Sequence, residues 1–319
     1  AHRSKQRKVS KERRVSEAIE FGISCRLLGG AKQEARRAEE LGYDYLLTGE
    51  HIMFHGPVGN NMVSLAAAAG ATERIKLMSG IVLVPLYPAA LLAKQVSVLD
   101  VVSDGRFSLG VGVGGEFPKE FDAVGVPVKE RGARTDEAMQ VLDLLLREKD
   151  VHFDGRFTKL DGVSISPRGV QKPRVPFWVA GRKDVAMRRA ARYAEGWLPY
   201  MYTPEMLDES MTKIAAFTEE ANRPAGTVQG GLFIFTCVHE DRATALDLAN
   251  QQLSRQYNQD FSKLVEKYTI AGSPDDCIKR LQEYVDAGAR TVMFSQGCPP
   301  EYVEQNTKLI AETIIPAFR

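Results

Sequence analysis

Long apolar runs, clustered cysteines and an excess charge of either sign are all missing from this 319-residue chain. No apolar stretch approaches the about 20 residues that cross a bilayer, and no signal peptide precedes the first expected strand, so we expect a cytoplasmic protein without a membrane partner. The four cysteines are scattered and show no metal-ligand spacing, which predicts reduced thiols and no metal site. A net charge of +1 gives no reason to expect a nucleic-acid partner.

Charge of one sign does collect at the N-terminus. Residues 1–20 form a basic arm, which we set apart from a folded region at residues 21–319. Such a run is ordinarily a solvated tail and less often a binding arm, so we treat it as peripheral to function. Its basic residues are Arg3, Lys5, Arg7, Lys8, Lys11, Arg13 and Arg14.

Apolar, β-branched segments alternate with helical segments along nearly the whole chain. Eight such units are typical of a (β/α)8 barrel, whereas an open doubly wound sheet fits the alternation less well than the regular count. We therefore predict an α/β protein built as a single (β/α)8 TIM barrel. The expected strands cover residues 21–25, 45–48, 76–81, 106–109, 177–180, 196–198, 232–238 and 291–294. The expected helices cover residues 32–41, 62–71, 89–102, 130–147, 184–193, 204–221, 243–255, 275–287 and 301–317.

One segment before the fifth expected strand departs from this repeat. Residues 152–160 read as two short strands around the turn Asp154-Gly155, which predicts a small hairpin. Three prolines follow the hairpin and support an insertion here. A second insertion is expected over residues 257–269. The prolines are Pro167, Pro173 and Pro176.

In a (β/α)8 barrel the active site is built at the C-terminal ends of the strands. Glu50 and His51 follow the second strand, where a histidine can donate or accept a proton and a carboxylate can orient it. The alternative is a structural pair at the barrel rim, but the location favours function. His55 is a weaker candidate nearby.

Glycines follow the third and fourth strands. Ser79-Gly80-Ile81 permits the close approach of a flat ligand, although glycine alone also fits a simple bend. Residues 110–115 formally match a dinucleotide fingerprint, but Pro118 interrupts and no helix opens at once, so we reject that interpretation. A glycine-rich rim beside a cofactor ring fits better, with Gly112 and Gly114 near the ring and Glu116 as a polar contact.

The turn after the fifth strand predicts an anion site. Ala180 and Gly181 lead into Arg182 and Lys183, and a helix follows. A helix N-terminus offers outward N–H groups and positive potential, which suit a phosphate. An ordinary turn with solvated cations is the alternative, and the position at a strand end favours the phosphate. Four residues after the sixth strand either line a pocket for a planar ligand or pack at the rim: Trp197, Pro199, Tyr200 and Tyr202.

A series of short motifs runs in one order from Phe21 to the end of the chain. They are Glu50-His51, residues 74–82, residues 93–96, Leu99-Asp100, residues 103–107, residues 110–114, residues 130–132, residues 175–197, residues 272–278 and Ala287-Gly288. In this order they resemble the bacterial luciferase-like monooxygenase superfamily. The basic arm lies outside the resemblance.

The resemblance implies a flavin- or deazaflavin-dependent oxidoreductase on a (β/α)8 barrel, acting on a small-molecule substrate as a homodimer. The Gly181-Arg182 turn and the glycine run are most similar to the coenzyme F420-dependent subset, with FMN as the alternative cofactor. Glu50 stands where some F420 enzymes carry an aspartate. The implied cofactor-binding residues are Ser79, Gly80, Ile81, Gly112, Gly114, Glu116, Ala180, Gly181 and Arg182.

The family also implies the chemistry and one backbone feature. A non-proline cis peptide is expected at Ser79-Gly80 or Gly80-Ile81, behind the cofactor ring. His51 would exchange a proton with the substrate, with Glu50 orienting it, during hydride transfer to or from C5 of F420 or the equivalent reaction on FMN.

Two other classes of protein remain open. One is a flavin-binding barrel that has lost turnover. The other is an aldolase- or isomerase-type barrel, which would need a strand-end lysine or a paired carboxylate base. No expected strand ends in lysine, and Lys183 is better explained by the anion site. The substrate cannot be read from the loops.

Overall fold

The computed structural model describes residues 18–319 and has the predicted (β/α)8 barrel fold. Of the basic arm predicted for residues 1–20, residues 1–17 lie outside the described residues. The eight barrel strands are β1 (Glu20–Ser24), β2 (Tyr45–Thr48), β3 (Lys76–Ser79), β5 (Phe107–Gly112), β8 (Phe177–Ala180), β9 (Gly196–Leu198), β10 (Gln229–Val238) and β12 (Ala289–Gln296).

Helical segments follow these strands along the chain, as the alternating pattern predicts. Within residues 18–319, no helix is long and apolar enough to span a membrane. The α-helices are α2 (Ala31–Glu40), α3 (Asn61–Ala69), α4 (Ala89–Val102), α5 (Pro118–Ala123), α6 (Arg131–Arg147), α7 (Asp184–Tyr193), α8 (Pro204–Glu220), α9 (Arg242–Tyr257), α10 (Val265–Tyr268), α11 (Pro274–Asp286) and α12 (Val303–Leu309).

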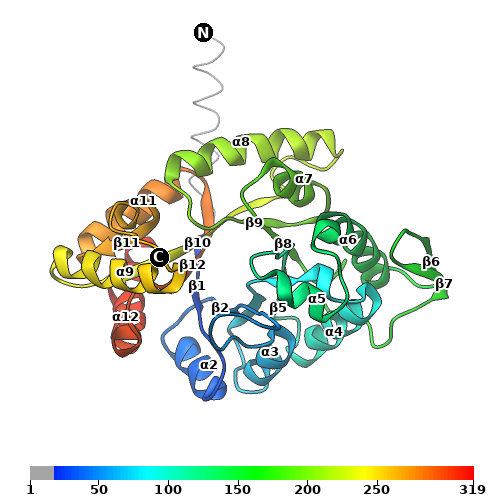
Figure 1. Cartoon of the computed structure of the whole chain (residues 1–319), viewed down its shortest axis with the longest axis horizontal. Coiled ribbons are helices and arrows are strands. Elements are labelled where there is room, and N and C mark those ends of the chain that lie inside the picture. The colour runs from blue at the N-terminus through cyan, green and yellow to red at the C-terminus, as the bar shows by residue number, and fades with distance from the viewer. Residues whose placement is uncertain (1–17) are drawn as a thin grey trace, which may run out of the picture. The chain divides into compact units, whose positions relative to one another are not determined.

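The contacts of the described chain group into two compact units. The larger unit comprises Ile23–Leu198 and Ile214–Val228. In it, β2, β3, β5, β8 and β9 pair in this order, and every one of these pairings is parallel. Helices α2, α3 and α4 lie side by side along one flank of these strands (Figure 1).

These strands carry apolar residues on both of their faces, which explains why they are buried in the core. Leu46 and Leu47 on β2 are both fully buried, as are Leu77 on β3 and Phe107 on β5. Parallel strands covered by helices read as nearly continuous apolar runs, because neither face meets water. The C-terminal ends of these strands therefore converge on one edge of a rigid scaffold.

The predicted hairpin is confirmed. Strands β6 (Val151–Asp154) and β7 (Lys159–Val163) pair antiparallel before β8, and Gly155 N–H donates to Thr158 O across the turn at 2.9 Å. Figure 1 shows the hairpin extending beyond α6, away from the parallel strands. It is an insertion rather than part of the barrel.

The second unit comprises residues 18–22, Pro199–Lys213 and Gln229–Arg319 within the described chain. Its central strand, β10, pairs in parallel with β12 and with a short strand, β11 (Thr269–Gly272). The sequence analysis missed β11 and took the preceding segment as an irregular insertion. Helix α11 starts with a capping box, in which Ser273 and Asp276 satisfy each other's backbone N–H groups.

Two strand ends differ from the prediction in a way that matters for the site. Strand β3 was expected to run on to Ile81 but ends at Ser79. Strand β5 was expected to end at Leu109 but continues to Gly112, and a two-residue strand, β4 (Val82–Leu83), pairs with that extension. Glycine is disfavoured in strands, so propensity ends the strand early. Parallel pairing with β8 and β4 overrides this propensity. The glycines leave room for the segment Ser79–Ile81, as described below.

Candidate active site

The predicted site residues of the larger unit follow the C-terminal ends of β2, β3, β5 and β8. These strands are parallel neighbours, and Thr48 at the end of β2 is in register with Ser79 at the end of β3. Glu50-His51, Gly80-Ile81 and the residues after Gly112 thus leave the same edge of the sheet. This is the edge that carries active sites in barrels of this type.

His51 is held by a carboxyl that lies far away in the sequence. Its Nδ1 lies 3.1 Å from Oε1 and 3.2 Å from Oε2 of Glu120, a separation of 69 residues along the chain. Glu120 is completely buried on helix α5 and also accepts the backbone N–H of Ile52 at 3.1 Å. A carboxylate at Nδ1 holds a proton on that nitrogen and so leaves Nε2 to exchange a proton with a substrate.

This arrangement corrects the expectation that Glu50 orients His51. Oε1 of Glu50 accepts the Leu83 N–H at 2.9 Å, and Oε2 accepts the Tyr87 hydroxyl at 2.9 Å and the Asn61 N–H at 3.2 Å. Burial raises the pKa of the Glu50 carboxyl, although these hydrogen bonds lower it in part. Glu50 ties the loop after β2 to β4 and to the start of α3.

Sequence reasoning missed Glu120 because it looked for a partner next to His51 in the chain. The available signal was Pro118, which interrupts the glycine run and is a favoured residue in a helix's first turn. A short helix at this point carries Glu120 back toward the strand ends. Only the three-dimensional fold shows which residue it meets.

Aromatic side chains fix the loop that carries His51. The His51 ring stacks on Phe54, with ring centres 4.2 Å apart and an interplanar angle of 14°. His55 meets the edge of Phe117 at 5.3 Å. The structure thus gives His55 a packing partner and His51 support on a second side.

A cavity of about 280 Å³ opens beside His51. It lies entirely within the larger unit, between the loop after β2 and the segment around β4. The residues that line it are Glu50, His51, Ile52, Val58, Gly59, Asn60, Leu83, Leu86 and Tyr87.

The glycines of β5 face the segment that follows β3. A Cβ on Gly110 would lie 1.9 Å from Ser79 O, and one on Gly112 would lie 1.6 Å from Ile81 Cδ1. Ser79 Oγ donates to Gly110 O and accepts the Gly110 N–H. The Gly80–Ile81 peptide is cis, at one of the two positions expected for it. The glycines therefore allow Ser79–Ile81 to lie directly on the strand.

The structure places the other residues of the predicted cofactor rim just beyond β5. A Cβ on Gly114 would lie 3.2 Å from Leu83 Cδ2, so Gly114 also packs against the β4 segment. Glu116 is exposed, four residues before Glu120. Both stand near the strand ends, where the sequence analysis expected them.

The segment predicted to bind an anion is a tight turn between β8 and α7. Ala180 ends the strand, and Gly181 has a φ of +124°, a conformation that favours glycine. Arg182 and Lys183 are exposed immediately before α7. The helix N-terminus and two cations fit a phosphate, while Asp184 in the first turn offsets part of this charge.

Two of the aromatic residues after the sixth strand, for which pocket lining and rim packing were both left open, belong to the core. Trp197 is fully buried and donates its indole N–H to Gly181 O at 2.9 Å. Tyr202 is 3% exposed, with its hydroxyl 3.2 Å from Ser210 Oγ. Trp197 thus holds the turn at Gly181 through its indole N–H.

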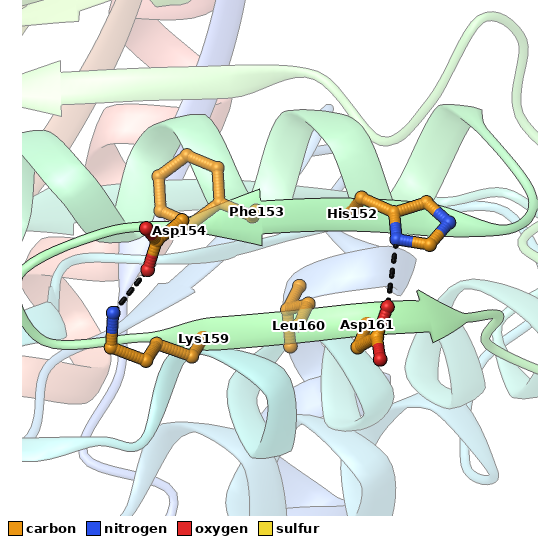
Figure 2. Close-up of a pocket in the computed structure, with 6 residues that line it drawn as sticks. All are labelled: His152, Phe153, Asp154, Lys159, Leu160 and Asp161. Carbon is orange, nitrogen blue, oxygen red and sulfur yellow. Dashed lines mark hydrogen bonds and ion pairs between the residues drawn. The ribbon is translucent and has the colours of Figure 1, made fainter.

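A second, larger hollow of about 500 Å³ lies on the β6–β7 hairpin. Figure 2 shows its two cross-strand pairs, His152 with Asp161 and Asp154 with Lys159. The His152 side chain is 62% exposed and that of Asp161 is fully exposed. Ion pairs in water contribute little, and this surface holds none of the predicted site residues, so the cavity beside His51 is the better candidate.

Comparison with known proteins identifies the family to which the chain is similar. The family model for luciferase-like monooxygenases matches residues 27–291. An uncharacterised protein of Mycobacterium tuberculosis is 31% identical over 182 residues, which cover 57% of this chain and 62% of that protein. The F420-dependent glucose-6-phosphate dehydrogenase of Microbacterium testaceum is 27% identical over 317 residues, which cover 88% of this chain and 91% of that enzyme. The first match therefore spans less than two thirds of its relative, and the second spans most of it.

Solved structures share the fold and differ in cofactor. The coenzyme F420-dependent tetrahydromethanopterin reductase of Methanopyrus kandleri superposes with a TM-score of 0.79 at 21% identity, covering 95% of this chain and 100% of that one. The oxygenating constituent of 3,6-diketocamphane monooxygenase of Pseudomonas putida, solved with FMN, gives a TM-score of 0.76 at 17% identity, covering 95% of this chain and 99% of that one.

Proposed function

Because this chain belongs to the luciferase-like monooxygenase family, we propose that it is an oxidoreductase that uses coenzyme F420 for hydride transfer. The nearly full-length similarity to an F420-dependent dehydrogenase supports F420 over FMN. A homodimer, a cytoplasmic location and a small-molecule substrate are part of the same proposal.

The observation that carries the proposal is the pairing of His51 with Glu120. A histidine with one ring nitrogen fixed by a buried carboxyl, at the edge of a cavity, is arranged for general acid–base catalysis. His51 would take or return a substrate proton at Nε2. Glu120 would hold the required tautomer, and stacking on Phe54 would hold the plane of the ring.

The chain offers residues for the two ends of the cofactor. At the phosphate end, Gly181, Arg182 and the α7 N-terminus provide a fitting donor set. At the ring end we propose Ser79, Gly80 and Ile81, together with Gly112 at the end of β5 and Gly114 and Glu116 just after it. The bound cofactor would supply the hydride chemistry, while the protein sets orientation and proton exchange.

Titration of the purified chain with F420 and with FMN, followed by fluorescence, tests the cofactor. We expect saturable F420 binding. Tight FMN binding without F420 binding would instead establish the FMN-dependent alternative, and binding of neither would refute the proposed function. Binding with no turnover of any substrate would support the non-catalytic barrel.

Replacing His51 with Ala tests the catalytic assignment. We expect turnover to fall by about 10²–10⁴-fold, the usual contribution of a general acid or base, with F420 affinity nearly unchanged. Unchanged turnover would make His51 a structural residue.

A further inference from the structure

The chemical character of the cavity beside His51 restricts what can occupy it. Its walls include four apolar side chains, those of Ile52, Val58, Leu83 and Leu86. Among the residues that the structure describes, none of those lining the cavity is Lys or Arg. Its volume of about 280 Å³ lies just below the about 300–1,000 Å³ of typical ligand pockets. The occupant is therefore small.

The polar side chains of the cavity are already engaged with one another. The Tyr87 hydroxyl donates to Glu50 at 2.9 Å, and the Asn60 side-chain amide donates to Tyr87 Oη at 3.1 Å. Asn60 Oδ1 accepts the Val63 N–H at 3.1 Å, as the N-cap of α3. These polar groups already hydrogen-bond to other parts of the protein, so they have little hydrogen-bonding capacity left for a ligand. His51 is the exception, because its contact with Glu120 uses only Nδ1.

From this arrangement we infer that the substrate is a small, uncharged molecule with one hydroxyl or carbonyl group on an apolar body, and that sugar phosphates are excluded. The inference rests on the proposed function and names the substrate class of the same site. The single polar group of the substrate would meet His51 Nε2, and its apolar body would meet Val58, Leu83 and Leu86.

A phosphorylated substrate does not fit for a physical reason. Its charged group would lose hydration in the cavity and find no cationic side chain to replace it, with the Glu50 carboxyl nearby. The relative from Microbacterium testaceum is named for glucose 6-phosphate. The lining of the cavity in this chain argues against glucose 6-phosphate as its substrate.

The reaction balances with a secondary alcohol as substrate and oxidised F420 as the electron acceptor. The alcohol O–H bond breaks and its proton passes to His51 Nε2. The C–H bond on the same carbon would break with both electrons leaving as hydride, for which bound F420 would supply the acceptor, and the C=O bond of the ketone would form. His51 then releases the proton to water, and ketone reduction runs through the reverse steps.

The test compares substrate classes on the full chain loaded with F420. We expect kcat/KM for at least one of isopropanol, cyclohexanol and menthol to exceed that for glucose 6-phosphate by about 100-fold or more. A higher kcat/KM for glucose 6-phosphate than for the alcohols would overturn the substrate assignment. So would the absence of turnover with every alcohol while F420 is bound. Either result would leave the cofactor assignment standing. Failure to bind either cofactor would instead refute the proposed function.

Binding to the cofactor-free protein provides a readout that does not depend on turnover. Saturation-transfer NMR should detect cyclohexanol, and Val58→Lys should weaken its binding about tenfold by placing a charge at the cavity wall. Val58 is 38% exposed, so the variant can fold. The control is Val102→Lys, at an exposed position on α4 outside the cavity lining, which should bind like the parent chain. Equal binding by Val58→Lys, or displacement of cyclohexanol by added F420, would refute the assignment of this cavity to the substrate.

Discussion

The imidazole of His51 and the carboxyl of Glu120 are joined through Nδ1 at 3.1 Å, linking the loop after β2 to helix α5. Glu120 also accepts the N–H of Ile52, so one buried carboxyl fixes both the ring and the backbone that carries it. An acid that binds one ring nitrogen of a histidine fixes the tautomer and the orientation of the imidazole. The proposed role of this pair in catalysis can be tested separately from its role in folding.

Replacing Glu120 with Gln should lower kcat by roughly 100-fold, because an amide N–H facing Nδ1 favours the wrong tautomer. The amide oxygen can still accept from Ile52, so the fold should survive. F420 affinity should be nearly unchanged, while the pH profile of kcat/KM should shift. The control is Glu209→Gln, at an exposed position on α8. A loss of stability with an unchanged pH profile would make Glu120 a structural residue only.

Glu50 should give the protein an unusual pH dependence. Burial raises its pKa above the ordinary value of 4.5, so the folded chain binds more protons than the unfolded chain in the interval above that value. The contribution of Glu50 to the free energy of unfolding is therefore fully present below 4.5 and is lost as pH rises through the raised value.

Comparison with Glu50→Gln isolates this contribution, because other titrating groups cancel. The variant should lose about 1–3 kcal/mol at low pH, since its amide cannot accept from both Leu83 and Asn61. The difference in the free energy of unfolding between the two proteins should narrow as pH rises above the ordinary value of 4.5, as measured by urea unfolding. A difference that widens with pH would mean that the hydrogen bonds outweigh burial.

Gly110 should tolerate no side chain. A Cβ there would lie 1.9 Å from the backbone oxygen of Ser79, which cannot move aside like a flexible side chain. Gly110→Ala should therefore cost at least about 1–3 kcal/mol in denaturant unfolding. Gly132→Ala is the matched control, because Gly132 lies within α6 with open space around it. This change should raise the free energy of unfolding by about 0.5–1 kcal/mol. Equal effects of the two variants would contradict the close packing of β5 on Ser79.

Arg182→Ala should weaken F420 binding about tenfold, the loss expected for one charge-assisted contact of about 1.4 kcal/mol, and should leave kcat almost unchanged. The effect should shrink as salt is added, because Arg182 is exposed. Arg192→Ala removes a cation from the other end of the same helix and serves as the control. If both variants bind F420 equally well, the phosphate does not lie at the α7 N-terminus.

Local patterns were enough to predict much of the fold. Helix α7 was expected over residues 184–193 and begins and ends there, because its buried residues recur on one face and a glycine turn precedes it. The β6–β7 hairpin followed from its Asp154-Gly155 turn. These features depend on residues close together in the chain, where spacing alone determines which side chains share a face.

Contacts between distant segments escaped the sequence analysis. Strand β5 runs on through Gly112 because β8 and β4 pair with it there, and β11 is a strand because β10 offers it a partner. In both cases the deciding energy comes from a neighbouring segment rather than from local propensity.

The sequence by itself determined the order of the eight barrel strands and placed His51, Gly80 and Gly181 after strand ends, since parallel strands bring their C-termini to one edge. The tertiary structure alone decided that Glu120, not Glu50, contacts His51, and that Glu50 is committed to Leu83 and Tyr87. A hydrogen bond depends on where two atoms lie in space, and neighbouring positions in the chain did not reveal which carboxyl the imidazole would meet.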